Sequence, residues 1–178
     1  MCSPSVEVVA VIGSHLRPGD PFDSSGHTAD NAAAKASALL ELADVSVPVV
    51  AGSNVALSDR RTPIPSAGVE AILAAAHADD PRPLFLCCGA GLTEVASAWL
   101  IDPSIATRLT VVWIGGAEHP GVEPPPGAPP AEYNTAIDPV AAQVVLNDSD
   151  LPVWQVPRDA YRQTLASFDE LDAALTGP

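Results

Sequence analysis

The fold is decided by the stretch from Leu109 to Val145, LTVVWIGGAEHPGVEPPPGAPPAEYNTAIDPVAAQVV. It opens with a continuous apolar run, Leu109–Ile114, which predicts a buried strand that breaks at Gly115-Gly116. A proline-rich loop follows, and the triplet Glu132-Tyr133-Asn134 then precedes a helix that we expect to begin near Asp138. In α/β proteins, a strand that ends in glycines and leads polar side chains into the next helix is a common place for a binding site.

Apolar runs and helical patterns alternate along the rest of the chain. The expected strands are Val6–Ile12, Val47–Ala51, Leu84–Cys88, Leu109–Ile114 and Val153–Val156. The expected helices are Ala29–Ala43, Gly68–Ala78, Thr93–Leu100, Asp138–Leu146 and Ser167–Leu175. Because right-handed crossovers join such alternating elements, the pattern predicts an α/β fold with a doubly wound, mainly parallel sheet. No domain linker interrupts the pattern, so residues 1–178 are expected to form a single domain.

Composition limits the classes of function. The chain has 178 residues, of which 47% are hydrophobic and 17% charged, so it can bury a core despite its 19 prolines. The net charge of −14 argues against a nucleic-acid partner, because such binding uses clustered lysine and arginine. No apolar run approaches the roughly 18 residues of a membrane span, and the start of the chain lacks a signal-peptide pattern. We therefore expect a soluble cytoplasmic protein without membrane contact.

The cysteines and histidines do not predict a disulfide framework or a zinc site. Cys87 and Cys88 are adjacent in an apolar strand and, with Cys2, are expected to be reduced, buried thiols. Adjacent strand residues point to opposite faces, so Cys87 and Cys88 are poor joint ligands for one metal. The histidines lack zinc spacing and are expected at the surface: His15, His27, His77 and His119.

Two motifs leave alternatives open. Gly89-Ala90-Gly91-Leu92-Thr93-Glu94 is half of a dinucleotide fingerprint, but Glu94 takes the place of the third small residue. We favour a tight strand-to-helix turn with a functional backbone, with a Rossmann-type nucleotide-binding protein as an alternative.

Glu132 and Asn134 share one face of an extended segment and suit a vicinal diol. A helix-capping loop, with Asp138 as N-cap and Pro139 at the first helical position, explains the same residues equally well.

Several segments, taken in order, resemble the inosine/uridine-preferring nucleoside hydrolases. They are LFLCCGAGLTEVASAWLIDPSIATRLTVVWIGG at 84–116, AEYNTAIDPVAAQVV at 131–145 and LPVWQVPRDAY at 151–161. The family's hallmarks there are a G-P-L-T-N-x-A turn, an M-G-G strand end, an A-E-F-N triplet and a D-P-x-A-A helix. The earlier DNAAAKASALLELADVSVPVVAG, at 30–52, is similar to the family's asparagine-alanine helix leading into P-V-x-x-G. The resemblance covers nearly the whole chain.

This resemblance implies a fold of the nucleoside hydrolase type and hydrolysis of the N-glycosidic bond of a ribonucleoside, which releases base and ribose. It also implies a Ca²⁺ that orients the ribose hydroxyls and a water, with an oxocarbenium-like transition state. Carried over by position, Glu132 and Asn134 would bind ribose hydroxyls. Gly89 would offer its backbone carbonyl to calcium, a role that does not depend on a side chain.

The chain departs from the family at both ends. The family's D-x-D-x-x-x-D-D motif, which precedes the strand matched by Val6–Ile12, has no counterpart, and neither has its C-terminal histidine with a neighbouring aspartate. Glu94 stands where the family has asparagine. We therefore expect an incomplete sheet, and we keep a non-catalytic ribose- or nucleoside-binding module as the alternative function. The open edge beside Val6–Ile12 also predicts marginal stability or self-association into a homo-oligomer.

Overall fold

A computed structural model of the chain describes residues 5–164 and 166–176. Its strands are β1 (Val11–Gly13), β2 (Val49–Ala51), β3 (Leu84–Cys88), β4 (Leu109–Ile114) and β5 (Val153–Val156). Its α-helices are α1 (Thr28–Leu42), α2 (Ala67–Ala76), α3 (Thr93–Ile101), α4 (Tyr133–Ile137), α5 (Pro139–Gln143), α6 (Arg158–Tyr161) and α7 (Phe168–Thr176). A 3-10 helix covers Pro103–Thr107, and a π-helical turn covers Val144–Asp148.

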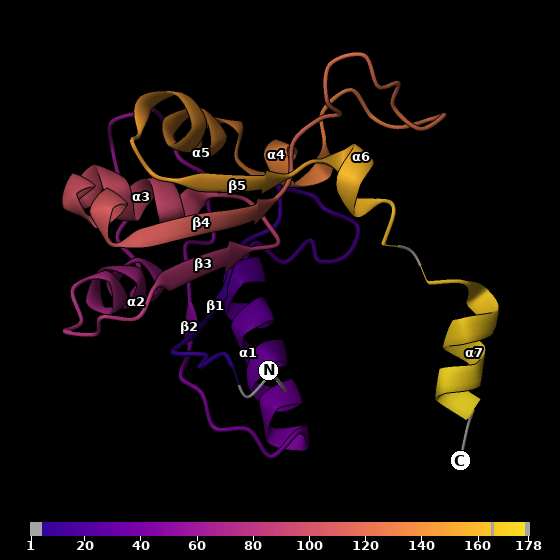
Figure 1. Ribbon diagram of the computed structural model, residues 1–178, viewed down its shortest axis with the longest axis horizontal. Helices are drawn as coiled ribbons and strands as arrows, with labels where there is room; N and C mark the ends of the chain where they lie inside the picture. The colour runs from indigo at the N-terminus through magenta and orange to yellow at the C-terminus, as the bar shows by residue number, and fades with distance from the viewer. Residues whose placement is uncertain (1–4, 165, 177–178) are drawn as a thin grey trace.

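The strands pair in parallel, which confirms the predicted α/β class (Figure 1). β4 is the centre of a three-stranded sheet, in which Leu84 of β3 pairs with Leu109 and Val153 of β5 pairs with Val111. β1 and β2 form a separate two-stranded ladder, with Val11 opposite Val49. The strands therefore do not form one continuous sheet within the described residues, and the edges of β1 and β3 that would adjoin are both unpaired there.

The first predicted strand is wrong in extent and in burial. We expected Val6–Ile12 to be buried on both faces, but β1 is confined to Val11–Gly13, and the side chains of Val6 and Val9 are 65% and 48% exposed. The physical reason is that β1 has a hydrogen-bonded neighbour only at β2 among the described strands. An apolar run can be buried on both faces only where neighbouring elements cover them.

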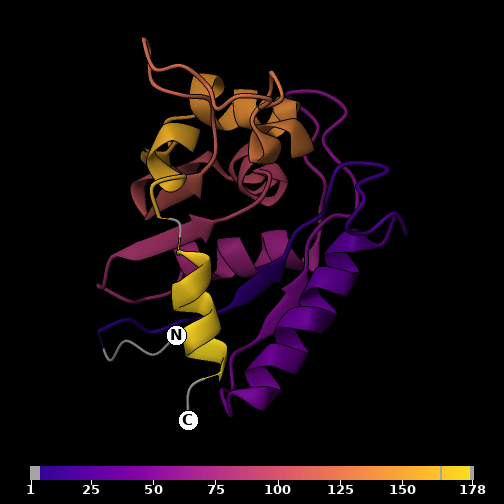
Figure 2. The ribbon, with the colours of Figure 1, turned by 90° about the vertical axis from the view of Figure 1, so that its right-hand side faces the viewer.

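The core lies on one face of the β3-β4-β5 sheet. Leu109, Val111 and Trp113 of β4 alternate towards it and are at most 4% exposed. α2, α3 and α5 carry the apolar residues that pack there, and these helices lie together along the sheet in Figure 1. α1 packs instead against β1 and β2, as Figure 2 shows from the side.

Helix starts follow the predicted capping chemistry. The Ser66 hydroxyl accepts a hydrogen bond from the backbone amide of Val69, and Asp138 caps α5 through the amide of Ala141. Ser167 and Glu170 form the expected capping box at the start of α7. The helix predicted from Asp138 to Leu146 instead divides into α5 and the π-helical turn.

Some predicted exposures are also corrected. Cys87 is exposed and Cys88 half-buried, both as free thiols, whereas Cys2 lies outside the described residues. Cys87 was expected to be buried, but no helix covers its face of β3 within the described chain. His15 is buried, contrary to the expected surface position, because its ring bonds to Thr93.

In residues 5–164 and 166–176, none of the helices has the length and apolarity needed to cross a membrane.

Candidate functional site

The carboxyl ends of β3 and β4 lie side by side, since these two strands pair in parallel. β3 leads into Gly89-Ala90-Gly91, and the indole Nε1 of Trp113 donates to the Ala90 carbonyl at 3.0 Å, which fixes this turn against β4. A Cβ on Gly91 would stand 2.7 Å from Cγ2 of Ile137, so the turn also packs closely on the end of α4. A Cβ on Gly89 would meet no atom within 4 Å, so this position faces open space.

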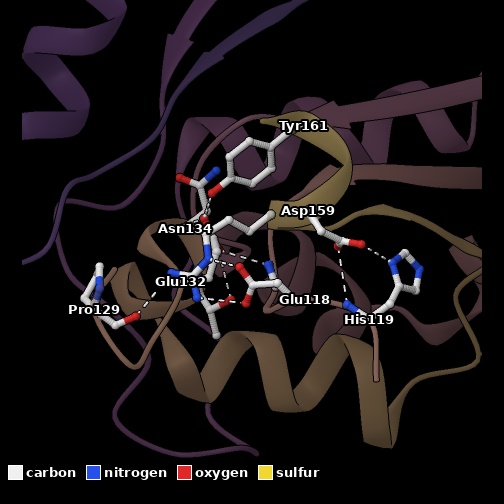
Figure 3. Close-up of polar contacts among 10 residues, drawn as sticks. Glu118, His119, Pro129, Glu132, Asn134, Asp159 and Tyr161 are labelled. Carbon is white, nitrogen blue, oxygen red and sulfur yellow. Dashed lines mark hydrogen bonds and ion pairs between the residues drawn. The ribbon is translucent and has the colours of Figure 1, made fainter. Parts of the chain in front are cut away.

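Glu132 joins the glycine turn after β4 to the start of α4 (Figure 3). Its side chain is buried, and its carboxylate accepts backbone hydrogen bonds from Gly116 at 2.9 Å, Asn134 at 3.1 Å and Thr135 at 3.0 Å. The Thr135 and Tyr161 hydroxyls also donate to it, each at 3.1 Å. Glu132 is thus the N-cap of α4, a role that the sequence did not predict, whereas the predicted capping role of Asp138 is confirmed.

These contacts keep the Glu132 carboxylate ionised. Burial alone would raise its pKa, but the amides of Thr135, Asn134 and Gly116 and the Tyr161 hydroxyl together hold the pKa below the ordinary value. A carboxylate offers about four lone-pair positions, and five donors already point at this one. A ligand hydroxyl can therefore bind Glu132 only by displacing the hydroxyl of Tyr161 or of Thr135.

Asn134 lies half-buried beside Glu132 and has a different hydrogen-bonding pattern. Its Nδ2 donates to the carbonyl of Ile114 at 2.7 Å, at the carboxyl end of β4. This bond orients the side-chain amide, and its Oδ1 accepts no hydrogen bond from the part of the chain that the structure describes. The Asn134 amide oxygen is therefore free to accept a hydrogen bond from a ligand.

A second buried polar chain lies at the same edge and was not predicted. Asp138 accepts from the Thr93 hydroxyl at 2.7 Å and from the backbone amide of Leu57 at 2.9 Å, in addition to capping α5. The Nε2 of His15 lies 2.8 Å from the Thr93 Oγ1. The only signals in the sequence were a histidine after the first strand and an Asp-Pro helix start. Neither of these indicated that the two residues share Thr93.

Glu94 lies in α3, which follows β3, and its carboxylate links this part of the three-stranded sheet to the β1-β2 ladder. Its Oε2 accepts from the Ser14 hydroxyl at 3.1 Å, after β1, and its Oε1 accepts from the backbone amide of Ser53 at 2.9 Å, after β2. A Cβ on Gly52 would stand 2.3 Å from Oε1, so the glycine makes room for this carboxylate. Burial raises the pKa of Glu94, and the bonds from Ser53 and Ser14 oppose that effect only in part.

The loop after β1 contacts α4 through Asp20 and Arg17, which sequence reasoning also missed. The Tyr133 hydroxyl donates to Asp20 at 2.7 Å, and the Arg17 guanidinium lies 5.2 Å from the centre of the Tyr133 ring. The backbone amide of Phe22 and the Tyr133 hydroxyl lower the pKa of the buried Asp20 carboxyl. The loop residues 14–27 therefore border the same edge as Asn134.

The proline-rich loop is tied to α6 on the other side of Glu132 (Figure 3). Arg158 binds Glu118 through Nε at 2.6 Å and through a second guanidinium nitrogen at 2.9 Å, and it also donates to the Pro129 carbonyl. This two-point ion pair is almost fully buried. His119 is exposed, as predicted, and pairs with Asp159 at 2.9 Å. These contacts fix Tyr161 in reach of Glu132.

The described residues do not make a calcium site by themselves. Residues 5–164 and 166–176 contain no group of three or more His, Cys, Asp or Glu side chains that could hold a metal. Calcium takes about six to eight oxygen ligands. The carbonyl of Gly89, at its open position, would supply one of these ligands, so the residues present do not fit the ion that the resemblance implies.

The sequence model of the inosine-uridine preferring nucleoside hydrolases matches residues 23–177. Over 100 residues the chain is 36% identical to the inosine-uridine preferring nucleoside hydrolase of Leishmania major, an alignment that covers 56% of this chain and 30% of that protein. It is 35% identical to the enzyme of the same name from Crithidia fasciculata, over 56% of this chain and 27% of that protein.

The fold is similar to the crystal structure of the inosine-uridine preferring nucleoside hydrolase from Bacillus anthracis, with a TM-score of 0.53 and 22% identity. That likeness covers 90% of this chain and 48% of the other. The chain thus spans less than half of the solved structure and less than a third of the curated relatives that it matches. The family's sequence model matches most of this chain, and this match shows that the chain belongs to the inosine-uridine preferring nucleoside hydrolase family.

Proposed function

We propose that this chain supplies the ribose-binding edge of a nucleoside hydrolase, which cleaves the N-glycosidic bond of ribonucleosides to base and ribose. The observation that carries the proposal is the placement of Glu132 and Asn134 together at the carboxyl end of β4, beside the open turn at Gly89. Membership of a family of nucleoside hydrolases supports this choice of ligand over other diols.

The bonding pattern of the two side chains suits adjacent hydroxyls. The Asn134 Oδ1 accepts from one sugar hydroxyl, while its Nδ2 stays bonded to Ile114 and keeps the amide oriented. The ionised Glu132 accepts from the neighbouring hydroxyl, which takes the place of the Tyr161 hydroxyl. A charged acceptor makes the stronger bond of the two. Holding the sugar rigidly lowers the entropic part of the barrier to glycosidic cleavage.

No residue of this chain is assigned to water activation. Glu94, Asp138 and Asp20 lie at this edge, but each is buried and bonded to its own surroundings. Calcium dependence, a role for the Gly89 carbonyl, a cytoplasmic location and self-association all stay predictions of the resemblance and of the sequence pattern.

Isothermal titration calorimetry with inosine, uridine and free ribose, each with and without Ca²⁺, tests the proposal. We expect binding of the ribonucleosides, and weaker binding of 2′-deoxyinosine, which lacks one of the two hydroxyls. Replacing Asn134 with alanine should weaken inosine binding by about tenfold, the loss expected for one buried neutral hydrogen bond. The exposed Asn147→Ala serves as the matched control and should bind as the wild type does.

Release of reducing sugar from inosine, measured in the same solutions, reports the reaction itself. Ribose release that depends on Ca²⁺ supports hydrolysis. Calcium-independent binding of intact nucleoside without ribose release would favour a non-catalytic binding module instead. Equal affinity for inosine and 2′-deoxyinosine, or an unchanged affinity in Asn134→Ala, would contradict the assignment of the ribose-binding edge.

A further inference from the structure

The face of the β3-β4-β5 sheet opposite the core is bare. Its side chains form rows across the strands, because Cys87 pairs with Val112 and Val112 with Trp154. The side chain of Trp154 is 60% exposed, and its ring is tilted by 49° against that of Phe85, with 5.4 Å between the ring centroids; Phe85 is 44% exposed. Parallel sheets are normally covered on both faces, so this apolar face lacks a layer in the described structure.

Helix α7 of the same chain has an apolar side that is exposed in the described structure. α7 has no buried residue, and the side chains of Phe168 and Leu175 are 90% and 84% exposed. Phe168, Leu171 and Leu175 are spaced three and four residues apart, so they form one apolar stripe. Asp169 and Glu170 lie off this stripe, whereas Asp172, four residues after Phe168 and three before Leu175, borders it. An isolated helix of this length is marginal in water and is stabilised mainly by packing its apolar side.

The connection allows the two surfaces to meet. α6 follows β5 at its carboxyl end, and residues 162–167 join α6 to α7. Gln163 and Thr164 continue the turn of α6 through backbone hydrogen bonds to Ala160 and Tyr161. The three residues that follow them reach about 10 Å when extended, which equals the spacing of packed layers of about 10 Å. α7 is roughly 14 Å long, which fits within a strand of the length of β4. Figure 1 shows α7 apart from the body of the molecule.

We infer that the bare face of β3-β4-β5 is the docking surface of the chain's own α7. Phe168, Leu171 and Leu175 pack over Phe85, Cys87 and Trp154, and the acidic side of α7 faces water. The chain then has a helix on each face of its three-stranded sheet. This inference is independent of the proposed ribonucleoside site, which lies at the strand ends rather than on the face.

Cys87 is a natural probe of this docking, since it lies in the middle row of the face. Alkylation of the full chain with N-ethylmaleimide, followed by fragment mass spectrometry, measures its reaction rate apart from that of Cys88. Burial raises the pKa of Cys88 to about 12, so that thiol reacts slowly. We expect Cys87 to react about tenfold faster in the double variant Leu171→Asp, Leu175→Asp than in the wild type, because the charges undock α7.

Ala173→Asp is the control, because it adds a negative charge on the opposite side of α7. It should leave the Cys87 rate unchanged. A positive test does not depend on loss of folding: after oxidation with diamide, which takes up the two electrons and two protons of the thiols, Leu171→Cys should form a disulfide with Cys87 within one chain, whereas Ala173→Cys should not. Equal Cys87 rates in all these variants would overturn the inference. Protection that appears only at high protein concentration, with disulfides between chains, would also overturn it and assign the face to α7 of a second copy.

Discussion

Replacing Glu132 with glutamine tests whether this carboxylate organises the end of β4. Glutamine keeps the size of the side chain but turns one acceptor oxygen into an amino group. Oε2 accepts the amides of Gly116 and Thr135, and Oε1 accepts the amide of Asn134. The least costly orientation therefore places the amino group at Oε1 and leaves the Asn134 amide without its partner, while the Tyr161 hydroxyl can turn and accept.

The expected change in the free energy of unfolding follows from these contacts. A buried donor left without an acceptor costs about 1–3 kcal/mol, and loss of the charged acceptor weakens the remaining bonds. We expect the free energy of unfolding to fall by about 2 kcal/mol in Glu132→Gln. In Glu132→Ala, all three amides and the helix cap are lost, so the fall should be about 4 kcal/mol.

Urea unfolding followed by far-ultraviolet circular dichroism measures both values. The wild type should also lose stability as the pH falls below the ordinary glutamate range, because the pKa of Glu132 is lowered in the folded chain and protonation then favours unfolding. Glu132→Gln should show less of this acid sensitivity.

Glu123→Gln is the control, since Glu123 is an exposed glutamate in the neighbouring proline-rich loop. It should change the free energy of unfolding by less than about 0.5 kcal/mol. A Glu132→Gln variant as stable as this control would refute the account of Glu132 as the hydrogen-bonded centre of the edge.

Three further changes have defined outcomes. Glu94→Gln should be more stable than the wild type at neutral pH, because burial raises the pKa of Glu94 and the folded chain loses stability as the pH rises through that raised pKa. The advantage should shrink as the pH falls through the raised pKa towards the ordinary value of 4.5, which thermal unfolding across pH checks. Gly13→Ala should cost more than about 2 kcal/mol in urea unfolding, since its Cβ would stand 2.5 Å from backbone atoms of Ala29 and Ala33. Gly89→Ala, whose Cβ meets open space, should unfold within about 0.5 kcal/mol of the wild type.

Local patterns predicted the elements where neighbouring structure was not needed to interpret them. The bounds of β3, β4 and β5 are those expected from the sequence, because each is a mainly apolar run that proline or glycine bounds on at least one side. Ser66 and Asp138 likewise act as the caps that their positions indicate, since capping depends on only a few residues along the chain.

Burial and partnership could not be predicted in the same way, because they depend on contacts between distant segments. Val6 and Val9 are as apolar as any strand residue, yet no described element covers them. His15 is buried because Thr93, far along the chain, offers a hydroxyl. Cys87 is exposed because its face of the sheet lacks a layer. At Glu132, residue type alone was compatible with a cap and with a ligand, and the geometry shows the cap.

We propose that ribonucleosides bind at the carboxyl end of β4. The most direct measurement is a titration of the ¹⁵N-labelled chain with inosine, followed by the backbone amide signals in heteronuclear NMR spectra. We predict saturable shifts at Gly89, Gly116, Asn134 and Thr135, which surround the proposed ribose position. Shifts confined to the shallow hollow at Arg60, Thr62 and Gln143, or no shifts at all, would contradict the claim.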